Sequence, residues 1–216
     1  MQPLALSLEI AVLATLLAGV GALGLIALTQ GRRIAAIVDA VLTAPLVLPP
    51  TVLGYYLLTV LGRRSALGGA WESITGNSFV FTRTGAVIAA TITALPLVLQ
   101  SARAAIDAVD PTLLDAARTL GATRLEALRR VALPLASRGV AAGLLLGFAR
   151  ACGDFGVTLM IAGNIPGETQ TAALALYDAV LAGRDADARF LAIALTVLAV
   201  TLIASVQWLG RRPHAR

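Results

Sequence analysis

The sequence contains few charged residues, few aromatic residues and a single cysteine. Of its 216 residues only 13% are charged and 5% are aromatic, whereas soluble domains carry about 25% charged residues. Hydrophobic residues make up 58% of the chain, and the mean hydropathy is +0.85. These values exclude a water-soluble domain and a disordered or collagen-like chain, and they indicate an all-α membrane protein.

The sequence has no lysine, and no group of residues stands out as a catalytic or metal-binding set. The 17 basic residues are all arginines, against 12 acidic residues. Such an excess can indicate nucleic-acid binding, but between apolar runs it favours cytoplasmic loops. Cys152 has no cysteine to pair with, and His214, the only histidine, lies in a basic tail. We therefore expect no catalytic set, metal site or cofactor. Without lysine the chain cannot complete a phosphate-binding G-x-x-x-x-G-K-[ST] loop.

Five apolar segments are long enough, or nearly so, to cross the hydrocarbon core, which takes about 20 residues. They are residues 6–29, 37–61, 84–106, 131–152 and 190–209. The first is not expected to be a cleaved leader, because no basic residue precedes it and its apolar run is too long. The whole chain, 1–216, is expected to form one transmembrane domain.

The arginines indicate the orientation of these spans. With the N-terminus outside, eleven of the seventeen lie inside and five outside, and Arg150 falls within a span. The positive-inside rule thus predicts an outer N-terminus and a cytoplasmic C-terminus. The inside arginines are Arg32, Arg33, Arg103, Arg118, Arg124, Arg129, Arg130, Arg138, Arg211, Arg212 and Arg216.

The second span contains Pro45, Pro49, Pro50 and Gly54, so it must kink or open. Broken helices occur at membrane depth where they are buried in protein or line a water-filled cavity. Candidate pathway residues are therefore Pro49, Pro50, Thr51 and Gly54. The alternative is a kinked helix that packs against its neighbours without touching a substrate.

The segment 153–183 has two apolar pieces, 155–162 and 171–182, each too short to span. The turn-forming run "GNIPGE" separates them, which predicts a re-entrant or interfacial hairpin on the outer side; an extra crossing stays open. Near the outer end of the fourth span, Arg150 and Asp154 are further pathway candidates. Arg150 could attract an oxyanion, or the two could form an i,i+4 ion pair. Cys152 is predicted to lie in the outer half of the membrane.

The loop at about 108–134 combines several helix-end signatures. Asp110 and Pro111 are typical of an N-cap and a first helical residue. Gly121 can end that helix in the left-handed conformation, and Thr123 with Glu126 forms a capping box for a second helix. We expect a helix-turn-helix on the cytoplasmic side.

The same loop resembles the EAA loop of ABC importer permeases. In that loop E-A-A is followed by three residues, Gly, nine residues, a branched apolar residue, one residue and Leu-Pro. Here Asp115 stands in place of Glu, and the spacing to the Gly and to the Leu-Pro is complete. By resemblance, the first helix is the coupling helix that sits in a groove of a separate ATPase. The coupling residues are then Asp115, Ala116, Ala117, Arg118, Gly121, Leu133 and Pro134.

Two further runs, "PLVLPPTVLGYYLLTVLGRRSALG" and "FARACGDFGVTLMIAGNIPGETQT", are similar to molybdate-type permease subunits. Tungstate and sulfate permeases share parts of both. The resemblance implies an ATP-driven importer in a bacterial inner membrane, with two copies of this chain. The implied partners are a cytoplasmic ATPase that holds ATP and Mg and an external oxyanion-binding protein.

Two functions of other classes compete with this one. A secondary transporter or channel would need mid-membrane carboxylates or an inverted repeat, and neither is evident in the sequence. An intramembrane enzyme would need a nucleophile and a base, for which no pair stands out.

Overall fold

The computed structural model describes residues 2–29 and 34–210. His214 and five of the arginines used for the orientation, namely Arg32, Arg33, Arg211, Arg212 and Arg216, lie outside the described residues. The helices are α1 (Gln2–Thr29), α2 (Ala35–Val47), α3 (Pro50–Leu61), α4 (Ala66–Thr75), α5 (Arg83–Asp107), α6 (Pro111–Thr119), α7 (Arg124–Ala127), η1 (Leu128–Ala132), α8 (Leu133–Cys152), α9 (Gly156–Ala162), α10 (Ala172–Leu181) and α11 (Asp185–Gly210).

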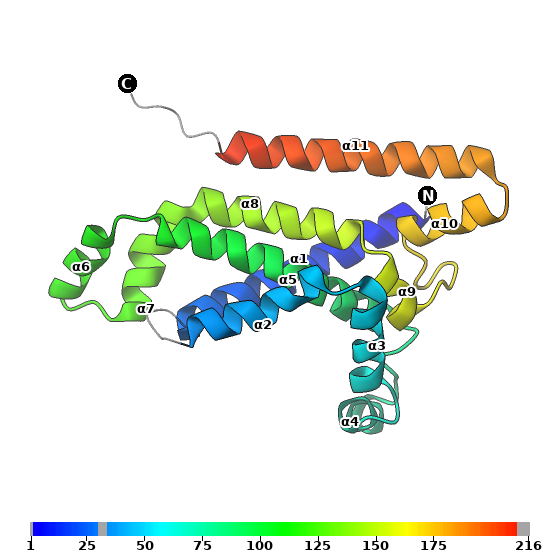
Figure 1. The fold of residues 1–216 in the computed structure, drawn as a ribbon, viewed down its shortest axis with the longest axis horizontal. Coiled ribbons are helices and arrows are strands. Elements are labelled where there is room, and N and C mark those ends of the chain that lie inside the picture. The colour runs from blue at the N-terminus through cyan, green and yellow to red at the C-terminus, as the bar shows by residue number, and fades with distance from the viewer. Residues whose placement is uncertain (1, 30–33, 211–216) are drawn as a thin grey trace.

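The centre of the structure is a bundle of three long helices, α1, α5 and α8, which pack side by side (Figure 1). Small residues form the seams between them. Ala11, Ala14, Ala18 and Ala22 recur at helical spacing on α1 and are fully buried. On α8, a Cβ at Gly143 would lie 2.8 Å from the Cβ of Ser101 on α5. Such close backbone approach is how helices associate in lipid, where apolar burial alone gives no preference for a partner.

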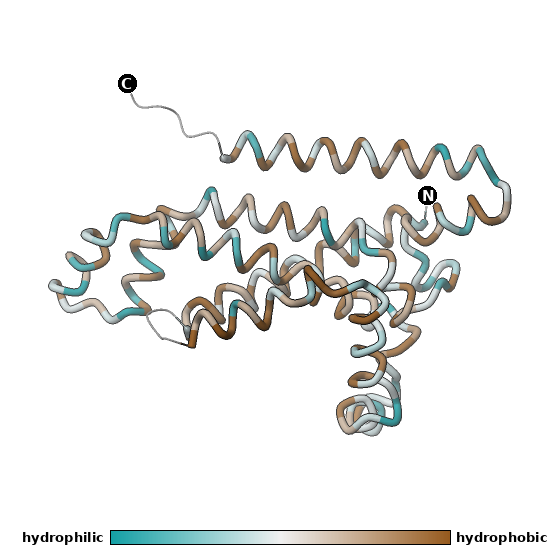
Figure 2. The backbone as a smooth tube through the Cα atoms, viewed as in Figure 1, coloured by the Kyte–Doolittle hydropathy of each residue, from teal (hydrophilic) through white to brown (hydrophobic). Residues whose placement is uncertain are grey.

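The four long spans lie where the sequence predicts them. Helices α1, α5 and α11 and the continuous rod Arg124–Cys152 are each long and apolar enough to cross a membrane. The rod begins earlier than the predicted 131–152, because α7 runs through the π-helical turn η1 into α8. Apolar residues cover the long helices along their length (Figure 2).

The predicted second span is broken rather than merely kinked. Helices α2 and α3 meet at an angle of 115°, and they count as a fifth span only if taken together. Leu48 and Pro49 have extended backbone between them, because Pro50 opens a new helix and disfavours helical geometry in the residue before it. Helix α4, which the sequence analysis did not anticipate, follows at the far end of α3 (Figure 1).

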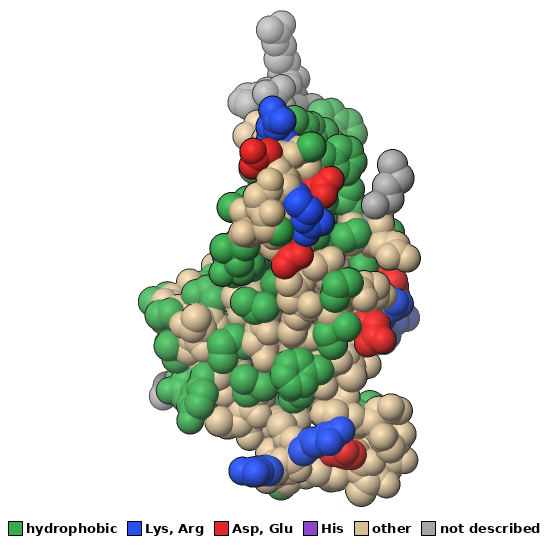
Figure 3. Space-filling view, turned by 90° about the vertical axis from the view of Figure 1, so that its right-hand side faces the viewer, with side chains coloured by type: hydrophobic (Ala, Val, Ile, Leu, Met, Phe, Trp, Pro, Cys, Tyr) green, Lys and Arg blue, Asp and Glu red, His purple; other side chains and the backbone are tan. Residues whose placement is uncertain are grey.

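The two ends of the bundle differ in what they carry. Helices α6 and α7 lie at one end, and the start of α1, the short helices α9 and α10 and the start of α11 lie at the other (Figure 1). Figure 3 views this second end, where charged side chains gather over the α10–α11 turn and over α4. The predicted pieces 155–162 and 171–182 are confirmed as the short helices α9 and α10.

Candidate functional site

The loop between α5 and α8 has the predicted corner geometry. Asp110 caps α6 by accepting a hydrogen bond from the Thr112 backbone N–H at 2.9 Å, and Pro111 is the first helical residue. Gly121 follows α6 with φ +89°, the left-handed conformation that favours glycine. Thr123 and Glu126 form the capping box that starts α7. The predicted helix, glycine corner and second helix are confirmed.

The hydrogen bonds at the α6 cap lower the pKa of Asp110 below its ordinary value. The largest contribution is the backbone N–H of Thr112, followed by the Thr112 hydroxyl. Both donors favour the ionised carboxylate. The cap is therefore charged at neutral pH, where it also complements the positive end of the helix dipole.

The residues that the resemblance assigns to coupling are mostly exposed. Asp115 and Ala116 are exposed on α6, and Asp115 pairs with Arg118 one turn later at 3.1 Å. Leu120, which the sequence analysis did not single out, is 88% exposed at the end of α6. Among the remaining predicted residues, Ala117 and Leu133 are half-buried, Gly121 is exposed, and Pro134 is exposed in the first turn of α8.

Arg150 and Asp154 form the predicted i,i+4 ion pair, with Arg150 Nη1 3.0 Å from Asp154 Oδ1. The Asp154 side chain is only 1% exposed, and its other oxygen accepts hydrogen bonds from the N–H of Thr158 at 3.0 Å and from the Thr158 hydroxyl at 2.6 Å. The carboxylate thus joins the end of α8 to the first turn of α9. Three donors offset the cost of burying it.

Helix α9 in turn packs against α3 of the broken span. A Cβ at Gly156 would lie 2.7 Å from Pro50 Cβ, and one at Gly54 would lie 2.8 Å from Met160 Cβ. The structure therefore brings the predicted Pro50 and Gly54 to the helix that Asp154 holds. Gly54 is buried, whereas Pro49, Pro50 and Thr51 are exposed at the break. Cys152 is buried at the α9 end of α8, opposite the loop.

Two polar contacts at the bundle were missed by sequence reasoning. Arg83, at the start of α5, donates to the carbonyls of Gly167 at 3.0 Å and Glu168 at 3.1 Å, and so clamps the turn after α9. Arg103, near the end of α5, lies 2.9 Å from Asp39 of α2. The second pair could have been suspected, because Asp39 lies at the start of the predicted span 37–61 and Arg103 at the end of 84–106, where ionisable groups near a membrane span usually have a partner.

The profile of the family described as "Binding-protein-dependent transport system inner membrane component" matches residues 11–214. The chain belongs to this family, and is thus a multi-pass membrane protein.

Named relatives are similar over most of the chain. The molybdenum transport system permease protein ModB of Escherichia coli (strain K12) is 40% identical over 183 residues, which are 84% of this chain and 80% of that protein. ModB of Azotobacter vinelandii is 40% identical over 190 residues, 87% of this chain and 84% of that protein. A putative molybdenum transport system permease protein of Bacillus subtilis (strain 168), YvgM, is 40% identical over 163 residues, 76% and 72% of the two chains.

The fold also matches a solved structure. A chain from the crystal structure of an amino acid ABC transporter with histidines superposes with a TM-score of 0.63. The match covers 97% of this chain and 92% of that one, at 20% sequence identity. This likeness shows the fold of an ABC transporter permease.

Proposed function

We propose that this chain is the membrane-spanning permease subunit of an ATP-driven importer that carries molybdate into the cell. The observation that carries the proposal is the exposed corner of α6, Gly121 and α7 in a chain 40% identical to molybdenum transport permeases. A short helix on a rigid corner can transmit a push to the spans on both sides of the loop. Tungstate and sulfate are the alternative cargoes, because all three are tetrahedral dianions.

The partners follow from what the chain carries. An ABC ATPase on the cytoplasmic side would receive α6, with Leu120 and the Asp115–Arg118 surface in its groove, and would bind the ATP and Mg. An external protein would deliver the oxyanion to the end formed by α9 and α10. Two copies of the chain, related by a two-fold axis, would enclose the pathway. In this arrangement the chain itself hydrolyses nothing, although the complex is a translocase.

The orientation proposed is N-terminus outside and C-terminus in the cytoplasm, across the inner membrane. The α6–α7 loop then faces the ATPase, and α9 and α10 face the outside. Single cysteines at Leu120 and Glu168, both exposed, test this by labelling from either side of the membrane. The native Cys152 is buried and serves as a silent background. Labelling of Glu168→Cys only from the cytoplasmic side would overturn this orientation.

Pro49, Pro50, Thr51 and Gly54, together with Arg150 and Asp154, are proposed to lie along the pathway. Arg150 is 30% exposed and keeps guanidinium N–H groups beyond the one that contacts Asp154. A guanidinium suits a tetrahedral oxyanion, and the adjacent carboxylate would keep its affinity low enough for release. Arg150→Gln should therefore lower transport more than it lowers assembly of the complex.

The decisive experiment is reconstitution of the tagged chain with its ATPase and binding protein in proteoliposomes. We expect ATP-dependent uptake of molybdate. Competition by tungstate and by sulfate for this uptake measures the preference among the three anions. The matched control is Leu120→Glu, which should abolish ATPase association while the membrane dimer still assembles. Uptake that persists without ATP or any ATPase partner would mean a secondary transporter or channel instead.

A further inference from the structure

Helix α2, the inner half of the broken span, is loosely attached to the bundle. None of its thirteen residues, all of which the structure describes, is fully buried, whereas α1 and α5 each contribute eleven buried residues. Its main neighbour is α5. Apolar side chains such as Ile37, Val41 and Val47 are exposed on it. Packing alone therefore holds α2 less firmly than it holds the central helices.

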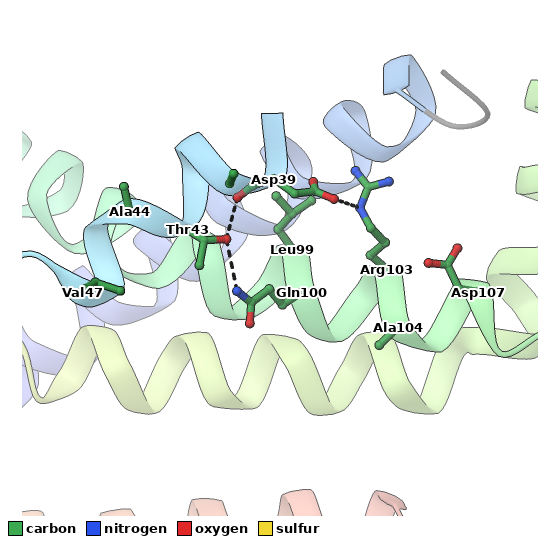
Figure 4. A pocket seen from close by; sticks show the side chains of 10 residues that line it. Asp39, Thr43, Ala44, Val47, Leu99, Gln100, Arg103, Ala104 and Asp107 are labelled. Carbon is green, nitrogen blue, oxygen red and sulfur yellow. Dashed lines mark hydrogen bonds and ion pairs between the residues drawn. The ribbon is translucent and has the colours of Figure 1, made fainter. Parts of the chain in front are cut away.

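Polar contacts add to the apolar packing that Leu42 of α2 makes against the core. Asp39 Oδ2 lies 2.9 Å from Arg103 Nε, and both side chains are mostly buried, at 29% and 18% exposure. The same guanidinium donates to Thr29 Oγ1 at 2.9 Å, at the end of α1. One turn along α2, Thr43 Oγ1 accepts a hydrogen bond from Gln100 Nε2 at 3.1 Å. Figure 4 shows both contacts bridging α2 and α5.

A cavity of about 500 Å³ lies between the two helices at these contacts. Asp39, Thr43, Gln100 and Arg103 line it, together with Asp107. The Asp39–Arg103 contact is an ion pair but not a well-aligned hydrogen bond, and among the described residues nothing donates to the buried Asp39 Oδ1. A pair that is incompletely satisfied beside open space can separate more readily than a fully bonded one.

The ion pair is also close to the loop proposed to receive the ATPase. Arg103 lies one helical turn before Asp107, the last residue of α5, and Asp110 caps α6 three residues later. A displacement of α6 therefore reaches Arg103 through a single turn of helix, about 6 Å long. The predicted coupling residues and the broken span are thus connected by a short path through α5.

We propose that Asp39 and Arg103 are a positioning pair that holds α2 against α5 in the resting transporter and releases it when the loop moves. Release would let the inner half of the broken span swing at the Leu48–Pro49 break while α3 stays fixed against α9. This inference rests on the proposed function, because it assumes that an ATPase displaces α6. The inference goes beyond the proposed function by naming the two residues, Asp39 and Arg103, that couple the inner end of the pathway to the displacement of α6.

The test compares Asp39→Asn, Arg103→Gln and the double variant in the reconstituted complex. Each single variant leaves one partly buried charge without its partner, whereas in the double variant an amide can bond to an amide across the same gap. We expect each single variant to raise ATP hydrolysis without binding protein by roughly fivefold, the lower end of measured coupling factors between sites. The amount of molybdate transported per ATP should fall in parallel. The double variant should partly reverse both effects, the rise in ATP hydrolysis and the fall in transport per ATP.

Controls separate this role from general stability. The pair of Arg63 and Glu72, 3.2 Å apart beside α4 and outside the surfaces proposed for the partners, gives the matched variants Arg63→Gln and Glu72→Gln. These should leave transport per ATP unchanged. Thr43→Val leaves the ion pair but removes the Gln100 contact and the hydrogen bond that the Thr43 hydroxyl donates to the Asp39 carbonyl within α2. It should shift coupling in the same direction by less. Assembled single variants with wild-type transport per ATP would overturn the proposal, and so would strictly additive effects in the double variant.

A second measurement does not depend on how the charge variants fold. Cysteines at Ala40 and Ala104, two exposed residues that line the cavity on opposite helices, can be bridged by a reducible cross-linker. Bridging should block ATP-driven uptake, and reduction should restore it. A bridged complex that transports at the wild-type rate would show that α2 need not leave α5. If no ATPase binds the unmodified chain at all, the proposed function itself fails, which is a distinct result.

Discussion

The two ends of the bundle are built in opposite ways. At the α6–α7 end, the hydrogen bonds that define the corner join residues two to five positions apart, such as Asp110 with Thr112 and Thr123 with Glu126. At the α9 end, the local bonds of Asp154 are joined by contacts between residues far apart in the chain: Arg83 with Gly167, and Ser7 with Ala172. A corner held by local bonds keeps its shape while its surface stays free for a partner. The α9 end keeps its shape only as part of the bundle.

The largest effect is expected at Asp154, which breaks the contrast, because its contacts reach only four residues along the chain but are buried. Replacing it by alanine leaves Arg150 without its ionic partner and Thr158 without its acceptor, so we expect the free energy of unfolding to fall by about 3 kcal/mol. A denaturant titration in mixed micelles measures this. The control Asp178→Ala removes an exposed pair and should cost less than about 1 kcal/mol. Equal losses for the two variants would mean that the α9 end does not depend on the buried carboxylate.

A second change tests the packing of α9 against the broken span. Gly156→Val adds a side chain where a Cβ alone would lie 2.7 Å from Pro50 Cβ, and overpacking of this kind costs about 2 kcal/mol. Gly24→Val is the matched control, since nothing lies within 4 Å of a Cβ at that helical glycine. In the same denaturant titration, Gly156→Val should show a lower free energy of unfolding than Gly24→Val. Equal free energies of unfolding for the two variants would show that α3 can move away from α9 at little energetic cost.

At the opposite end, Gly121→Val should act locally. The positive φ is strained for a β-branched residue by at least ~1 kcal/mol, and a Cβ there meets no neighbour within 4 Å. We therefore expect the bundle to unfold as in wild type, while ATP hydrolysis stimulated by the binding protein falls. Gly121→Asn, which tolerates this conformation, should retain most of the stimulation. Wild-type stimulation with valine would show that the corner does not need the left-handed conformation.

The smallest expected effect is a pH dependence of the α6 cap. Because the folded pKa of Asp110 is lowered, its carboxylate contributes stability above the unfolded value, about 3.9, and loses it as the pH falls through the folded pKa. A spin label on Leu113→Cys should therefore become more mobile as the pH falls through the folded pKa of Asp110, which lies below the unfolded value. In Asp110→Asn the cap should show no such titration. An identical pH response in both variants would assign the change to another group.

Much of the α6–α7 end could be predicted because its determinants are consecutive in the chain. The N-cap at Asp110, the glycine corner and the capping box at Thr123 each involve a few neighbouring residues, and all three are found in the structure. The Arg150–Asp154 pair was also within reach, since residues four apart meet on one helix face. Their roles in coupling and transport stay predictions until the experiments above are done.

Composition and local sequence patterns were enough to predict the membrane class, the four long spans, an interruption of the second span and the helix corner. Each depends on composition, on a run of apolar residues or on a proline or glycine whose backbone preference acts locally. Tertiary structure alone decided the 115° angle between α2 and α3, the seat of α9 against Pro50 and Gly54, and the partnership of Asp39 with Arg103. These depend on which distant helices meet and in what rotation, and side chains 64 positions apart carry no local pattern that pairs them.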